Sequence, residues 1–200
     1  MSTPTWITLA NANMFNQVNT GTAISNFTAA TDITPGTNVA GNAYQTAPAQ
    51  LYPGQMWRFT ANGIWSSTAS PGISIGIYYG GAAGSPLCYG SVAAASAWSN
   101  AASVPWYLQA MGRVTATGSA TGAWNVVGML VGMQPTLGGT TGTGPVFPPS
   151  VVTPMPQYTA NAQYDTSVAK QITLASTCTA SAAANAITVY NWSVEYLTEP

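Results

Sequence analysis

The 200-residue chain contains no histidine, two cysteines and only four carboxylate side chains. Without histidine, Ser–His and Cys–His nucleophilic systems are excluded, and the commonest transition-metal ligand is missing. The carboxylates and cysteines are scattered and match no zinc or calcium spacing. Asp165 and Glu195 are the one pair that could serve as the two carboxyl groups of a glycosidase, and their spacing does not favour that role. We therefore expect a protein that is not an enzyme and that holds no metal or cofactor.

Charged residues are also nearly missing. They make up 4% of the chain, against about 25% in ordinary domains, and the cations are Arg58, Arg113 and Lys170. Three cations cannot build the positive surface that nucleic acid or an anionic membrane requires, so we exclude both as partners. A net charge of −1 favours association, which is harmless for a subunit held in a fixed assembly. Composition also allows a neutral secreted domain.

Targeting signals are not evident. The first residues, MSTPTWITLANANMF, lack the basic region and apolar core of a signal peptide. The longest strongly apolar run, Val126 to Met133, is too short to span a bilayer. With no export signal, we favour buried free thiols at Cys88 and Cys178 over a disulfide between them.

The residues that are present favour β-strands. Lys, Glu and Arg are too rare for the exposed faces of helices, while β-branched, aromatic, Gly and Pro residues dominate. Pro53 to Gly81 holds two apolar stretches with period-two alternation, joined by a turn at Pro71-Gly72. We interpret them as a β-hairpin or as two sequential strands, and beside the aromatic last strand they look like the centre of one sheet.

Further strand candidates run along the whole chain. They lie near residues 5–9, 23–27 and 38–44, and at 87–92, 104–117, 123–133, 165–174 and 186–197, with a turn at 118–122. Asp165-Thr166 is expected to bend the entry into a strand by accepting backbone hydrogen bonds. If their strands are neighbours, Arg58 or Arg113 could pair with Asp165 or Glu195. Eight to ten strands at this spacing predict a sandwich or barrel, in one domain over residues 1–200.

Two features of the sequence bear on contacts between this domain and other molecules. The Pro/Gly-rich stretch 135–156 cannot be a central strand, because proline lacks the backbone donor; it is either a partner-contacting loop or a passive excursion. Several strands are apolar on both faces, and aromatic residues on a second face suggest subunit contacts. The alternative is that loops or the N-terminal segment cover that face.

The pattern resembles the jelly-roll virion proteins of tailed bacteriophages, of the decoration, minor structural or head-fibre type. The resemblance rests on PGQMWRFTANGIWSSTASPGISIGIYYGG, on GRVTATGSATGAW and on YDTSVAKQITLASTCTASAAANAITVYNWSVEYL, and it covers residues 53–197 apart from the Pro-rich stretch. It implies an antiparallel jelly-roll β-sandwich and a homotrimer packed about a threefold axis. It supplies no catalytic residues.

We therefore expect a capsid decoration protein on the virion surface, assembled in the host cytoplasm, whose partners are its own copies and the major capsid protein or another virion protein. A receptor- or glycan-binding module of a head fibre or tail, with a host glycan as partner, is the alternative, and a cell-envelope carbohydrate hydrolase is disfavoured by the lack of a paired-acid motif. Residues 1–20 form the candidate docking arm, or simply a first strand. The candidate interface residues are Trp6, Ile7, Leu9, Met14, Phe15, Met56, Arg58, Tyr78 and Phe147.

Overall fold

The structure is a computed structural model that describes residues 11–16, 21–35, 44–46, 51–67, 71–92, 103–119, 121–133, 150–156 and 164–197, and the backbone alone at 11–16, 44–46, 133, 150 and 151. All twelve elements in these ranges are β-strands. No helix long and apolar enough to cross a membrane occurs in this part of the chain. The all-β prediction is confirmed.

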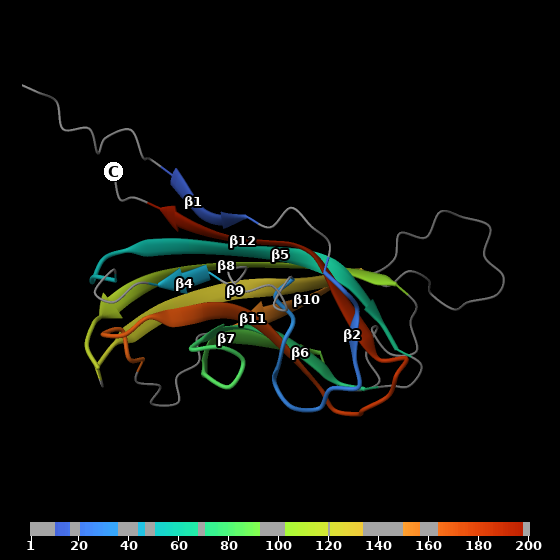
Figure 1. Ribbon diagram of the computed structural model, residues 1–200. Coiled ribbons are helices and arrows are strands. Elements are labelled where there is room, and N and C mark those ends of the chain that lie inside the picture. The colour runs from blue at the N-terminus through green and yellow to red at the C-terminus, as the bar shows by residue number, and fades with distance from the viewer. Residues whose placement is uncertain are drawn as a thin grey trace, which may run out of the picture.

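The strands form two antiparallel sheets that pack face to face (Figure 1). The large sheet has the order β1-β12-β5-β8-β9-β10, with β2 also paired to β12. Its strands are β1 (Asn11–Asn16), β2 (Ile24–Ser25), β5 (Met56–Ser66), β8 (Val104–Ala116), β9 (Ala123–Met133), β10 (Ser150–Met155) and β12 (Ala186–Leu197).

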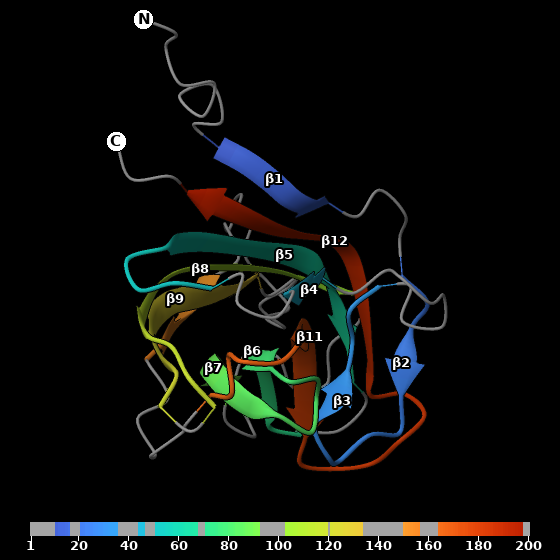
Figure 2. The same ribbon diagram turned by 60° about the vertical axis from the view of Figure 1, so that its left-hand side comes forward.

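The small sheet has the order β3-β11-β6-β7, with β4 also paired to β11. Its strands are β3 (Thr31–Asp32), β4 (Tyr44–Thr46), β6 (Ile73–Tyr79), β7 (Ser85–Val92) and β11 (Lys170–Cys178). The chain passes between the sheets after β2, β4, β5, β7, β10 and β11 (Figure 2). Repeated crossings between two packed antiparallel sheets are characteristic of a jelly-roll sandwich. The pairs β1–β2, β3–β4 and β6–β7 and the run β8–β9–β10 instead follow one another within one sheet. The predicted jelly-roll sandwich is therefore confirmed.

The core lies between the sheets because each strand turns one set of alternate side chains inward. In β5 every odd-numbered residue is buried and every even-numbered residue is half-buried. In β6 the three isoleucines and Tyr79 face the same interior. The largest fully buried side chains include Trp57, Phe59, Trp65, Leu108, Leu130 and Trp192. The periodicities predicted for residues 55–79 and 104–117 are thus confirmed.

Of the two alternatives for Pro53 to Gly81, the two sequential strands are confirmed and the hairpin is wrong, as is the placement of both strands at the centre of one sheet. Strand β5 lies in the large sheet and β6 in the small sheet. Gly72 at the start of β6 instead exchanges hydrogen bonds with Thr179 after β11, at 2.7 and 2.9 Å. A Pro-Gly turn signal marks a reversal of the chain, and it cannot distinguish a hairpin from a crossing between sheets.

The last strand contains a β-bulge, and strict alternation therefore assigns the two halves of the strand to opposite faces. The sequence places Ile187 and Val189 on one face and Trp192 and Val194 on the other, yet all four side chains are buried. The pairing of β12 with β5 shifts between Val189 and Asn191, so that Tyr190 is the extra residue. An extra residue reverses the alternation, and both halves of the strand therefore serve the same core.

Other predicted segments have mixed outcomes. Residues 5–9 lie outside the described residues, the segment 23–27 contains β2, and 38–44 reaches β4 only at Tyr44. Of the Pro-rich stretch 135–156, the described part is β10, an edge strand rather than a central one, as its prolines require. Both cysteines are buried free thiols.

Candidate functional site

The outer face of the large sheet carries a contiguous apolar patch over β8, β9 and β10. Residues directly opposite each other on antiparallel strands share a face, so the pairs Met111–Val127, Val131–Val152 and Met129–Pro154 lie side by side. Met111, Val127, Met129 and Val152 have between 44% and 57% of their surface exposed. We call Met111, Val127, Met129, Val131, Val152 and Pro154 the apolar patch.

This patch is unusual because the inner faces of the same strands already supply the core. On β8 and β9, Trp106, Leu108, Val126 and Leu130 are buried on the inner side. The outward apolar side chains therefore do not take part in the sandwich. A contiguous exposed apolar patch of this kind marks a surface that contacts another molecule.

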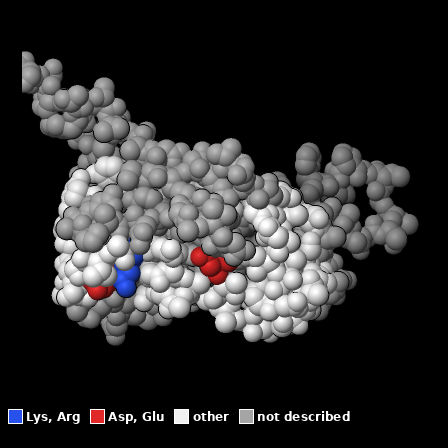
Figure 3. All heavy atoms as spheres, in the orientation of Figure 1, with Lys and Arg blue, Asp and Glu red and all other residues white. Residues whose placement is uncertain are grey.

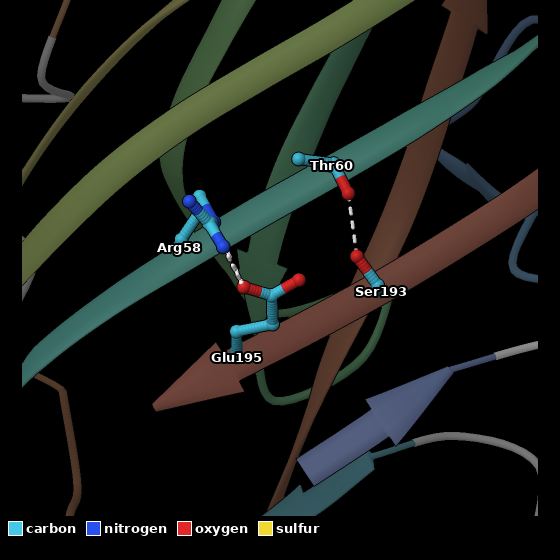
Figure 4. A network of polar contacts seen from close by, with 4 residues as sticks. All are labelled: Arg58, Thr60, Ser193 and Glu195. Atoms are coloured by element: carbon cyan, nitrogen blue, oxygen red, sulfur yellow. Dashed lines mark hydrogen bonds and ion pairs between the residues drawn. The ribbon is translucent and has the colours of Figure 1, made fainter. Parts of the chain in front are cut away.

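A polar band on β5 and β12 borders the patch (Figure 4). Arg58 and Glu195 lie opposite each other and form an ion pair, with the Arg58 Nε atom 2.8 Å from Glu195 Oε2. The hydroxyl groups of Thr60 and Ser193 share a hydrogen bond in the next row. Arg58 also faces Met111 across β5 and β8. The predicted pairing of an arginine with Glu195 is confirmed, and it neutralises the charge beside the patch.

Elsewhere the described surface is also poor in charge. Figure 3 shows charged atoms only in isolated spots on the described part of one face. Asp165 accepts hydrogen bonds from the backbone and hydroxyl of Ser167, which lower the pKa of its carboxyl group. Burial raises the pKa of Asp32, although the Thr34 amide donates to its carboxylate at 2.8 Å. Asp165 thus bends the chain before β11, as predicted.

Catalytic or metal-binding arrangements are not found among the described residues. No group of three His, Cys, Asp or Glu side chains there could hold a metal ion. Glu195 on β12 is paired with Arg58 on β5, while Asp165 lies in the turn before β11. Burial raises the pKa of the Cys88 thiol to about 12, which opposes formation of the reactive thiolate.

The predicted interface residues whose side chains the structure describes lie on both sheets. Met56 and Arg58 are half-buried on the outer face of β5, whereas Tyr78 is half-buried on β6 of the opposite sheet. Met14 and Phe15 belong to β1, of which the structure describes the backbone. Trp6, Ile7, Leu9 and Phe147 lie outside the described residues.

The sequence interpretation did not single out the residues of the apolar patch. The signal was present, because β8 and β9 carry apolar residues on both alternating faces. What alternation could not reveal was which face was the inner one and which strands were neighbours. Met129 and Pro154, which lie in different parts of the sequence, meet only through the pairing of β9 with β10.

Comparison by sequence finds no family model and no curated protein that matches the chain. Among solved structures, the chain is similar to the CBM2 module of the evolved Dit of Lactobacillus casei BL23 phage J-1. The TM-score is 0.35 and the identity 7%, over 96% of this chain and 98% of that chain. At this TM-score the likeness carries no argument about function.

Proposed function

We propose that the chain is a non-enzymatic structural component of a bacteriophage virion, and specifically a capsid decoration protein on the outside of the head. The observation that carries the proposal is the apolar patch. The domain that bears it has almost no charge, so electrostatic repulsion between molecules is weak. Burying such a surface releases about 25 cal/mol per Å². A virion subunit buries it permanently in its assembly. The jelly-roll topology and the sequence resemblance to phage virion proteins support the same role.

The occupant of the apolar patch in this proposal is another copy of the chain, in a homotrimer. Any partner of the patch must itself be uncharged and apolar, since a buried unpaired charge is costly. Each copy of this chain supplies such a surface. Of the two arginines that adjoin it, Arg58 is paired with Glu195 in the same subunit, and Arg113 lies two positions from Met111 on the same face of β8. Head-to-tail contacts between identical subunits close into a ring when the rotation allows it. The trimer then attaches to neighbouring capsid subunits.

A charge placed in the patch tests the trimer. Val127→Asp puts a carboxylate at a residue that is 55% exposed, and we expect the trimer to dissociate into folded monomers. Val168→Asp is the matched control, because Val168 is 43% exposed and lies before β11, away from the patch. Sedimentation measures the mass, and thermal melts confirm that both variants fold. A trimer that survives Val127→Asp, or a wild-type monomer, would overturn the assignment.

Attachment to the particle tests the virion role. Purified protein mixed with phage heads that lack it is expected to bind saturably and to raise the temperature at which the heads open. Deleting residues 2–10 should abolish this binding while leaving the trimer, because it removes part of the predicted arm without removing β1. Binding to tails instead would move the protein to a fibre or tail. If the protein binds neither heads nor tails, the proposal of a virion role is contradicted.

A further inference from the structure

A second set of side chains occupies the outer face of the large sheet, beside the apolar patch. Asn191, Asn62 and Tyr107 lie in one row across β12, β5 and β8, because each is the register partner of the next. Gln109 follows on the same face of β8, opposite Thr60 and Met129. We call Asn62, Tyr107, Gln109 and Asn191 the amide cluster. With neighbouring strands about 4.8 Å apart, its row spans about 10 Å.

The polar groups of the amide cluster differ from those of the band in Figure 4. Arg58 with Glu195, and Thr60 with Ser193, satisfy one another within the sheet. Within the described part of the chain, the side chains of the amide cluster form no hydrogen bond or ion pair with another side chain. Three amides, each with donors and an acceptor, and one tyrosine hydroxyl therefore remain available to a ligand.

We propose that the amide cluster is a shallow binding platform for a neutral glycan. Sugars present vicinal hydroxyl groups that pair with amide donors and acceptors, and C–H faces that pack on an aromatic ring such as that of Tyr107. The cluster contains no charged residue. Arg58 is paired with Glu195, and Arg113 lies six positions from Tyr107 along β8, about 20 Å away. An acidic glycan would find no cation beside Tyr107 and Asn62.

This platform adjoins the apolar patch on β8, where Gln109 lies opposite Met129 and Tyr107 lies opposite Val131. Asn62 and Asn191 extend from β8 in the other direction, toward β12. A flat site holds one sugar chain weakly, but three copies on one trimer, or many on one particle, would bind a glycan-covered surface with avidity.

The test measures binding of soluble neutral oligosaccharides, and of matched acidic ones, to the purified protein. Titration calorimetry or nuclear magnetic resonance gives the affinity. We expect saturable binding of a neutral oligosaccharide. Tyr107→Ala, and separately Asn62→Ala with Gln109→Ala, should weaken it at least tenfold, while Tyr107→Phe keeps the ring and loses less. Tyr89→Ala is the matched control, since Tyr89 is 38% exposed and Tyr107 is 39% exposed, and Tyr89 lies on the small sheet. Its affinity should stay within twofold of the wild type.

Three results would overturn the platform: no neutral glycan bound by the folded protein at millimolar concentration, a preference for acidic glycans, or equal losses from Tyr89→Ala and Tyr107→Ala. Thermal melts separate lost binding from lost folding. The mass of the trimer and its attachment to heads are measured on the same variants, and both are expected to be unchanged. Failure of the platform is therefore distinguishable from failure of the capsid role.

Discussion

At the scale of single residues, the few charges serve local structure. Glu195 holds Arg58 against the outer face of the large sheet. Asp165 and Asp32 each accept a backbone hydrogen bond from the residue two positions further along. A half-exposed ion pair contributes at most about 1 kcal/mol, so these contacts set local geometry, and burial of apolar groups supplies the stability. Burial also governs the chemistry of the Cys88 thiol.

Cys88 predicts a loss of stability in alkali. Burial raises its pKa to about 12 from an ordinary value of 9.0. Between these values the unfolded chain has released the proton and the folded chain retains it, so the free energy of unfolding falls as the pH rises. We expect a loss on the order of 2 kcal/mol between about pH 9 and pH 11. Cys88→Ala should remove this component, giving a flatter pH profile in urea unfolding. Parallel profiles for the two proteins would contradict the prediction.

At the scale of elements, β12 shows how one residue directs a whole strand. The bulge at Tyr190 lets Ile187 and Val189 on one side of it, and Trp192 and Val194 on the other, enter the same core. A strand without the bulge would expose one of these two pairs. The register of β12 also sets the neighbours on the outer face, including the Asn191–Asn62 pair of the amide cluster.

Deleting Tyr190 should therefore be far more damaging than truncating it. The deletion forces either Ile187 and Val189 or Trp192 and Val194 out of the core, at a cost of several kcal/mol. Because total stability is only about 5–15 kcal/mol, the variant is expected to unfold at much lower denaturant concentration or not to fold. Tyr190→Ala keeps the register and removes an exposed side chain, so it should change the free energy of unfolding by less than about 0.5 kcal/mol. A deletion tolerated as well as the substitution would show that the register is not fixed by the bulge.

Much of this element structure could be predicted from local patterns. Alternation identified β5, β6 and β8, and proline correctly kept residues 150–155 out of the sheet centre. The bulge could not be predicted, since it depends on which strand β12 pairs with. The crossing from β5 to β6 and the apolar patch were missed for the same reason: both arise from pairing between distant segments, which period-two alternation does not encode.

At the scale of the whole molecule, the outer face of the large sheet is divided. Toward β12 and β5 it is polar, with Arg58 paired to Glu195 and Thr60 to Ser193, and toward β9 and β10 it is apolar. A chain with net charge −1 has little long-range repulsion to prevent contact between copies. Copies of the chain therefore associate most favourably through the apolar half of this face. The polar half keeps its contact with water.

Oxidation of the methionines tests whether copies of the chain bury the apolar half of this face. Met111 and Met129 are 44% and 45% exposed in the single subunit, and Met155 is 1% exposed. Oxidation by hydrogen peroxide follows exposure, so in monomeric Val127→Asp protein Met111 and Met129 should oxidise readily and Met155 slowly. If the wild-type protein forms the proposed trimer, Met111 and Met129 should react at least fivefold more slowly in it, with Met155 unchanged, as measured by mass spectrometry of peptides. Equal oxidation in both proteins would mean that copies of the chain do not meet through β8 and β9, even if they form trimers.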